Sequence, residues 1–348
     1  MASAGIGSII GAGLGLAAVA VTAGVAAKVA AGTRALKPSA PAGASINAGG
    51  YHAGAAEVER FRELLRIPTV SDPDPARVDH AAFERYIGTL RRLYPKTFEA
   101  CEFTTIGSFD ILMRWPGVNQ ELDPIVTMAH QDVVPVEGQA WEHDPFGAEI
   151  VDGEIWARGS LDTKCIGAAI FEAIELLVSQ GYVPPRDVYY FSSDGEEIAG
   201  PAAASAVEWL RARGIHPYMV MDEGGAVAAD APLGVTEPVA MVGVSEKGHV
   251  DVTVTARADG GHASTPGAND ACRLLARVCE RTSANPGAPR FTRALDATLA
   301  ELAARAGGVY KPVFGNLWLT RPLVAKIMAG NAETGAMLRT TYALTQME

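Results

Sequence analysis

The chain has 348 residues, 48% of them hydrophobic, and a formal net charge of −11. This length suffices for a sizeable core and fits two domains. The acidic balance, without a block of Lys and Arg, argues against nucleic acid as a partner. The four cysteines form no C-x-x-C pair, so the sequence gives no support to a zinc knuckle or a thioredoxin-like motif.

The N-terminus differs in composition from the rest of the chain. No charge occurs before Lys28, and the segment from Gly5 to Ala27 consists mostly of Gly, Ala, Val, Ile and Leu. Its length is close to that of a membrane span, and the positive charges after it would leave the bulk of the chain cytoplasmic. A signal peptide normally has a basic residue ahead of its apolar part. A membrane anchor, a cleaved or atypical secretion signal and a disordered start therefore all stay open, followed by a flexible linker up to Gly50.

Strands and helices alternate from about residue 57 to residue 225. Apolar spacing predicts helices in residues 56–70, 79–95, 165–182 and 201–214, and strands in residues 110–117, 124–130, 186–194 and 218–225. This alternation predicts an α/β domain with a mostly parallel sheet flanked by helices. We place this domain at residues 51–245, after the apolar segment and linker of residues 1–50.

The pattern changes near Ser245. Residues 247–259 alternate with period two, which predicts a half-solvated strand of an antiparallel sheet. Residues 269–283 follow as a predicted helix. We therefore expect a second, smaller α+β domain at residues 246–348.

Apolar segments of the first domain end repeatedly in groups that can bind a metal. These groups are His130 with Asp132, Asp162 ahead of a helix, the pair Glu196 and Glu197, and the pair Asp222 and Glu223. In α/β sheets such ends converge at one edge, where ligands bind. A histidine with several carboxylates suits a divalent ion such as zinc, and so many carboxylates could not share one site without a cation.

Each of these signals also has a structural explanation. His130 could be a satisfied core histidine, and Asp162 could cap the following helix. The Glu-Glu pair could be solvated surface, and the Asp-Glu-Gly-Gly stretch could be only a loop. Their succession, each after a predicted buried strand, favours a metal site.

The chain resembles the co-catalytic zinc exopeptidases of the carboxypeptidase S / Gly-X carboxypeptidase type, whose wider family includes aminoacylases and succinyl-diaminopimelate desuccinylase. The resemblance runs from about Ala55 to the end of the chain, in "FRELLRIPTVS", "AHQDVVPVEGQAWEHDPFGAEIVDGEIWARGSLDTK", "SSDGEEIAG", "MDEGG" and "DGGHASTP". It implies a zinc-exopeptidase-like catalytic domain with an inserted lid or dimerisation domain, here partial. A homodimer formed through the second domain is the corresponding expectation.

The resemblance also implies a role for each metal ligand. His130 would bind one zinc ion, Asp162 would bridge two, and Asp222 would complete the protein ligands of the first ion. Glu197 would bind the second ion. Asp132 would accept a hydrogen bond from the His130 ring and fix its tautomer.

The implied reaction is hydrolysis of an amide bond next to a free carboxylate. The substrate would be a peptide C-terminus or an N-acyl amino acid. A hydroxide shared by the two ions would attack the carbonyl, with Glu196 as the general base. His262 would reach an active site, often that of the partner subunit, and stabilise the transition state.

The chain departs from the family pattern at two places. Gly195 stands where the family usually has an Asp directly before the Glu-Glu pair. No histidine follows His262, so the second zinc would have only Asp162 and Glu197 as protein ligands. We therefore expect a truncated form or fragment of a longer enzyme. The alternatives are a catalytically impaired protein that only binds metal or dimerises, and an aminopeptidase of related fold.

Overall fold

The computed structural model describes residues 22–37, 53–229, 235–262, 264–265, 267–268 and 270–346. The chain divides into two compact units: the sheet unit, residues 46–224, and the helical unit, residues 1–45 and 225–348. The boundary predicted from the sequence lies at 245/246, later than the division at 224/225.

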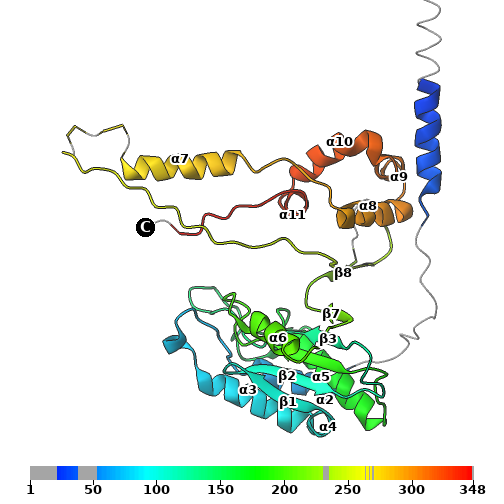
Figure 1. Ribbon diagram of the computed structural model, residues 1–348, viewed down its shortest axis with the longest axis vertical. Helices are drawn as coiled ribbons and strands as arrows, with labels where there is room; N and C mark the ends of the chain where they lie inside the picture. The colour runs from blue at the N-terminus through cyan, green and yellow to red at the C-terminus, as the bar shows by residue number, and fades with distance from the viewer. Residues whose placement is uncertain are drawn as a thin grey trace, which may run out of the picture. The chain divides into compact units, whose positions relative to one another are not determined.

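The sheet unit contains the alternating elements that the sequence predicts (Figure 1). Its helices are α2 (Ala55–Leu65), α3 (His80–Leu93), α4 (Pro95–Ala100), α5 (Lys164–Ser179) and α6 (Ala202–Arg211), with a short 3₁₀ turn η1 (Pro75–Arg77). Its strands are β1 (Glu102–Ile106), β2 (Asp110–Trp115), β3 (Ile125–Met128), β4 (Glu149–Val151), β5 (Glu154–Trp156), β6 (Val188–Ser192) and β7 (Met219–Met221).

The main sheet has five strands in the order β1-β2-β6-β3-β7. Strand β3 pairs in parallel with both β6 and β7, whereas β2 pairs antiparallel with both β1 and β6. Among these five strands β2 alone therefore runs against the common direction. The predicted α/β class, with a mostly parallel sheet flanked by helices, is confirmed.

Alternate residues of β2 face opposite sides of the sheet, as the two-residue period of a strand requires. Ile111 and Met113 join the core formed with helices α2 to α5, whereas Leu112 joins the core formed with α6. Ile111, Leu112 and Met113 are buried on the two faces of the sheet, which explains the apolar run in the middle of β2. A scaffold packed on both faces holds the ends of its strands in fixed positions.

Helix α3 shows how local sequence sets the boundaries of an element. The Asp79 side chain accepts hydrogen bonds from the first backbone N–H groups of the helix, as an N-cap does. The sequence predicted that this helix ends at Pro95. Instead it ends at Leu93, and Pro95 begins α4. Proline fits that first helical position because its missing N–H would have no partner there.

The larger core predicts a large stability effect at one phenylalanine. Phe171 of α5 is fully buried, and its ring contacts those of Tyr94, Phe98 and Tyr190. We expect Phe171→Ala to lower the free energy of unfolding by about 3–5 kcal/mol, because burial is lost and a cavity is left. Urea denaturation measures this. Val118→Ala, at a side chain that is 76% exposed, is the control and should change stability by less than about 0.5 kcal/mol.

The helical unit is built mainly from helices that follow a long extended segment. They are α7 (Ala271–Ala284), α8 (Arg293–Arg305), α9 (Tyr310–Phe314), α10 (Leu317–Ala329) and α11 (Ala332–Ala336), and a strand pair is formed by β8 (Ala226–Ala228) and β9 (Val239–Met241). Residues 22–35 are also helical. Buried side chains of α8 and α10, among them Leu295, Leu299 and Val324, form the core of this unit.

The strand predicted for residues 247–259 is wrong. Within the described residues this stretch belongs to no strand, and Val250 and Val252 are 76% and 74% exposed. An alternating pattern forms a strand only when a neighbouring chain segment satisfies its backbone groups. In the part of the chain that the structure describes, no backbone hydrogen bond joins this segment to another, and its contact with Arg339 and Thr341 is made by the Lys247 side chain.

The predicted apolar segment at the N-terminus lies mostly outside the described residues. Its end belongs to the helix of residues 22–35, which packs against the start of α10. The buried Asn316 side chain donates hydrogen bonds to the carbonyl oxygen of Val29 and the hydroxyl of Thr33. Among the helices that the structure describes, none has the length and hydropathy needed to cross a membrane.

Candidate metal centre

Polar side chains from separate segments meet at one edge of the sheet. Strands β3, β6 and β7 run parallel, so their carboxyl ends lie at the same edge. His130 follows β3, Glu196 follows β6 and Glu223 follows β7, while Asp162 precedes α5. The convergence expected from the sequence is therefore present in the fold.

One ring nitrogen of His130 faces three carboxylates. Its Nε2 atom lies 2.9 Å from Oδ1 of Asp162, 3.4 Å from Oε2 of Glu223 and 3.9 Å from Oε2 of Glu196. The imidazole is 2% exposed, whereas the Asp162 side chain is 70% exposed. The cluster thus has a buried nitrogen at its base and solvent access from the side of Asp162.

The other ring nitrogen of His130 is held by Asp132. Nδ1 lies 2.9 Å from the backbone carbonyl oxygen of Asp132 and 3.4 Å from its carboxylate. A proton on Nδ1 satisfies this contact and leaves a lone pair on Nε2 directed at carboxylate oxygens. That arrangement is repulsive unless a proton or a metal ion lies between them.

The electrostatics of the cluster show the same need for positive charge. Burial lowers the pKa of His130, but hydrogen bonding and charge from Asp132 and the charge of Glu223 outweigh it and raise this pKa to about 10. Burial also raises the pKa values of Glu196, Glu197 and Glu223, and neighbouring carboxylates add to this. A bound cation would stabilise these carboxylates in their ionised form.

The donor atoms fit a single divalent ion. His130, Asp162 and Glu223 each offer one ligand atom, and these atoms lie within 4.8 Å of one another. Ligands bound at about 2.1 Å in tetrahedral geometry are roughly 3.4 Å apart. The separations of 2.9 and 3.4 Å from Nε2 are close to this value. One imidazole with two carboxylates is also a donor set that zinc accepts.

The fold orients Asp222, a predicted metal ligand, differently from its sequence neighbour Glu223. Glu223 faces His130, whereas Asp222 is exposed and its carboxylate accepts a hydrogen bond from the Glu223 backbone N–H at 2.9 Å. The sequence singled out both residues at the end of β7 but assigned the ligand role to Asp222. Only the turn after β7 decides which of the two side chains points toward the histidine.

Asp132 has a contact that the sequence did not predict. Its fully buried carboxylate accepts hydrogen bonds from the backbone N–H groups of Glu196 at 3.1 Å and of Glu197 at 3.2 Å. Asp132 therefore fixes both the ring of His130 and the loop after β6. The only hint of this contact in the sequence was the position of Asp132, two residues after the predicted ligand His130 at the end of a predicted strand.

The remaining predicted residues occupy different surroundings. Glu197 is half-buried in the loop after β6, where its carboxylate interacts electrostatically with Asp162 and His130. His262 belongs to the helical unit, where its exposed ring contacts the Ser264 hydroxyl at 2.7 Å through Nδ1.

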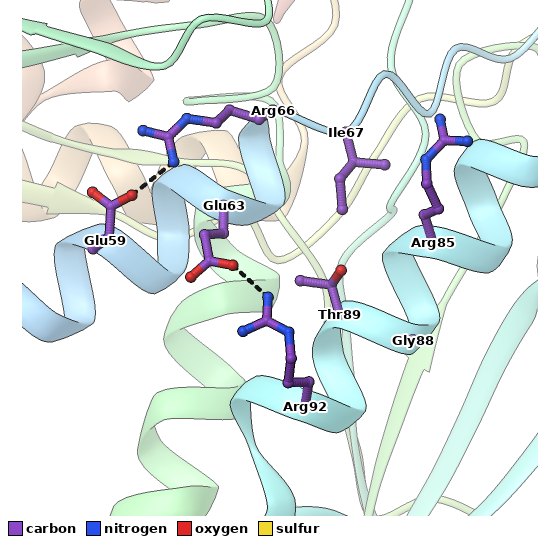
Figure 2. A pocket seen from close by; sticks show the side chains of 8 residues that line it. All are labelled: Glu59, Glu63, Arg66, Ile67, Arg85, Gly88, Thr89 and Arg92. Atoms are coloured by element: carbon purple, nitrogen blue, oxygen red, sulfur yellow. Dashed lines mark hydrogen bonds and ion pairs between the residues drawn. The ribbon is translucent and has the colours of Figure 1, made fainter.

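A hollow of about 560 Å³ lies between α2 and α3, and none of its lining residues belongs to the metal cluster. Figure 2 shows its charged side chains pointing at one another: Glu59 pairs with Arg66, and Glu63 pairs with Arg92. A further lining residue, Arg85, pairs with Asp79. Because its charges are matched within the protein, this hollow offers no charged group in need of a ligand.

Comparison with known proteins agrees with this geometry. The model of peptidase family M20/M25/M40 matches residues 126–318. An N-fatty-acyl-amino acid synthase/hydrolase PM20D1.1 of Danio rerio is 33% identical over 293 residues, covering 83% of this chain and 57% of the relative. A probable carboxypeptidase S-like 2 of Dictyostelium discoideum is 31% identical over 294 residues, covering 82% and 56%. Carboxypeptidase S of Saccharomyces cerevisiae is 33% identical over 246 residues, covering 66% and 42%.

Solved structures are also similar to this chain. The M20 family metallo-carboxypeptidase Sso-CP2 from Sulfolobus solfataricus matches with a TM-score of 0.42 and 22% identity, covering 49% of this chain and 38% of that one. The chain spans little more than half the length of the curated relatives that it matches over most of its own sequence. The resemblance stated from its motifs is confirmed, and the chain belongs to peptidase family M20/M25/M40.

Proposed function

We propose that this chain provides the metal-binding site of a hydrolase that cleaves an amide bond next to a free carboxylate. The observation that carries the proposal is the buried Nε2 of His130, which faces carboxylates from Asp162, Glu223 and Glu196. Relatives named as N-fatty-acyl-amino acid synthase/hydrolase and as carboxypeptidase S support it. Both names describe chemistry at an amide beside a carboxylate.

The proposed ligands follow from the donor geometry. His130, Asp162 and Glu223 hold one zinc ion, and Glu223 replaces Asp222 in this role. Asp162 and Glu197 are the groups available to a second ion, because their carboxylates lie close enough to interact electrostatically. Bound zinc supplies a Lewis acid that makes water more acidic and polarises the substrate carbonyl.

Glu196 is the proposed general base. Its carboxylate lies 3.9 Å from Nε2 of His130, and its side chain is 52% exposed, so it can meet both water and substrate. Burial and the neighbouring carboxylates raise its pKa. A carboxylate with a raised pKa can take the proton of the attacking water and then return it to the leaving amine.

Asp132 and His262 have supporting roles in this proposal. Asp132 orients the His130 ring and holds the backbone of the loop after β6, which carries Glu196 and Glu197. His262, exposed on the helical unit, is the candidate for contacting the carbonyl oxygen of the substrate. The second domain is proposed to form a homodimer.

An assay of paired substrates tests the proposed function. N-acyl amino acids of graded acyl length and unblocked dipeptides would be incubated with the zinc-loaded protein, alongside the same compounds with an amidated C-terminus. The proposal expects hydrolysis of the free acids and little hydrolysis of their amides. Equal hydrolysis of both forms would contradict recognition of the carboxylate, and no hydrolysis of any compound would contradict the proposed activity.

A pair of neighbouring variants tests the choice of ligand. Glu223→Gln should lower zinc affinity by more than about tenfold, because losing even the hydrogen-bond partner of a ligand costs roughly 10–100-fold. Asp222→Asn should leave zinc affinity within about threefold, because its exposed carboxylate does not face His130. Isothermal titration with zinc measures both. A larger loss in Asp222→Asn would restore the ligand expected from the sequence.

A further inference from the structure

The loop that carries Glu196 and Glu197 is held by side chains rather than by regular secondary structure. Successive backbone N–H groups donate to side-chain acceptors: Asp194 to Asp110 Oδ1 at 2.9 Å, Gly195 to Ser193 Oγ at 3.1 Å, Glu196 to Asp132 Oδ1 at 3.1 Å and Glu197 to Asp132 Oδ2 at 3.2 Å. The position of the proposed base therefore depends on these acceptors, of which Asp110 is the most distant in sequence.

Asp110 and Asp194 form a reciprocal contact between two segments. The backbone N–H of Asp194 donates to the Asp110 carboxyl, and the backbone N–H of Phe109 donates to the Asp194 carboxyl at 3.0 Å. Gln131 adds a hydrogen bond from its side chain to the Phe109 carbonyl oxygen at 2.6 Å. The turn between β1 and β2 is thereby joined to the loop after β6 and to the residue beside His130.

The two carboxyl groups meet in a place that disfavours two negative charges. Asp110 is only 4% exposed. The charged groups with the largest effect on it are Asp194 and Asp132, both acids, while His80 from α3 contacts the ring of Phe109. Burial raises the pKa of Asp110 most, the hydrogen bond from the Asp194 backbone N–H lowers it, and the charge and side-chain hydrogen bonding of Asp194 raise it, so that the pKa is about 7. Buried carboxyl groups in contact are stabilised when they hold one proton between them.

We propose that the buried Asp110 carboxyl holds a proton and that Asp110 and Asp194, through their reciprocal hydrogen bonds, are positioning residues for the loop that carries Glu196 and Glu197. With the proton in place, the pair joins the β1–β2 turn to the loop. When the proton leaves to solvent, two like charges remain at the base of the loop and loosen it. The functional meaning of this pair rests on the proposed role of Glu196, but its existence does not.

Asp110→Asn is the variant that isolates the proton on Asp110. The amide can still accept from the Asp194 N–H and can donate to the Asp194 carboxylate, but it does not titrate. In the folded state the pKa of Asp110 is raised from 3.8 to about 7. The protonated carboxyl therefore contributes its full stabilisation of the folded state below pH 3.8, and this contribution is lost as the pH rises through about 7. The unfolding constant of the wild type, divided by that of Asp110→Asn, should therefore rise between these pH values by up to about tenfold per pH unit.

Urea denaturation across about pH 4 to 9 measures this ratio. Asp194→Asn should give the same slope, so the test survives if one variant fails to fold. Asp187→Asn is the matched control, because Asp187 is also buried but forms an ion pair with Arg114 at 2.7 Å. Its ratio should not show the rise. A ratio for Asp110→Asn that does not change with pH, or an equal rise for Asp187→Asn, would overturn the proposed proton on Asp110.

Hydrogen exchange of the backbone amides in residues 194–197 tests the positioning role. After correction for intrinsic exchange rates, these amides should exchange faster in the wild type than in Asp110→Asn above about pH 7, and at similar rates near pH 5. Equal exchange at both pH values would overturn the positioning role. Neither experiment needs metal or turnover, so a failure of the proposed function would be recognised separately.

Discussion

Glu196→Gln is expected to remove hydrolysis while leaving zinc binding intact. The amide keeps the size and the exposed position of the side chain but can neither accept the proton of the attacking water nor return it to the leaving amine. General acid–base catalysis contributes about 10²–10⁴-fold to a rate, and kcat should fall by that factor. Steady-state kinetics on an N-acyl amino acid, with zinc content measured on the same samples, gives both quantities.

The control for this variant makes the same chemical change elsewhere. Glu121 is exposed and does not belong to the metal cluster, so Glu121→Gln should retain the wild-type kcat and zinc content. A Glu196→Gln protein with undiminished kcat would contradict the role of general base. Loss of zinc together with activity would instead identify Glu196 as a metal ligand.

His130→Ala is expected to abolish tight zinc binding. The imidazole is the one nitrogen ligand among the described residues of the cluster, and its buried position fixes it before the metal arrives. We expect zinc affinity to fall by at least about 100-fold, beyond the cost of removing a partner of a ligand. Thermal unfolding with and without zinc measures the loss, because a ligand that binds only the folded state raises the melting temperature.

His143→Ala provides the comparison for His130→Ala. His143 also contacts a carboxylate, that of Glu149 at 3.2 Å, and its ring packs against Trp156, but it lies outside the metal cluster. The zinc-dependent rise in melting temperature should persist in His143→Ala and disappear in His130→Ala. Its persistence in both proteins would place the ion elsewhere in the chain.

The sequence predicted the position of the site because strand ends are visible in an α/β pattern. Apolar runs before His130, Glu196 and Glu223 predict strands, and parallel strands end at the same edge of a sheet. The strand before Glu223, β7, was predicted to be buried, but its residues are exposed. The fold confirms the strands and brings these side chains close to the ring nitrogen. Local sequence was sufficient here because strand period and sheet topology alone decide which residues converge.

The finer geometry depended on turns and tertiary contacts that carry no periodic signal. The choice between Asp222 and Glu223 is made by the turn after β7. Backbone N–H groups of the loop after β6 donate hydrogen bonds to the carboxylates of Asp132 and Asp110, which are far from this loop in sequence. For residues 247–259 the periodic signal was clear but the predicted strand was wrong. In the described part of the chain this segment forms no strand, because no backbone hydrogen bonds pair it with another segment.

The proposed function depends on a zinc ion held by His130, Asp162 and Glu223. A crystal of the protein soaked in zinc, with diffraction data collected on both sides of the zinc absorption edge, tests it most directly. We expect an anomalous peak about 2.0–2.2 Å from His130 Nε2 and from one carboxylate oxygen each of Asp162 and Glu223. An anomalous peak only at other residues, or none at this cluster under saturating zinc, would contradict it.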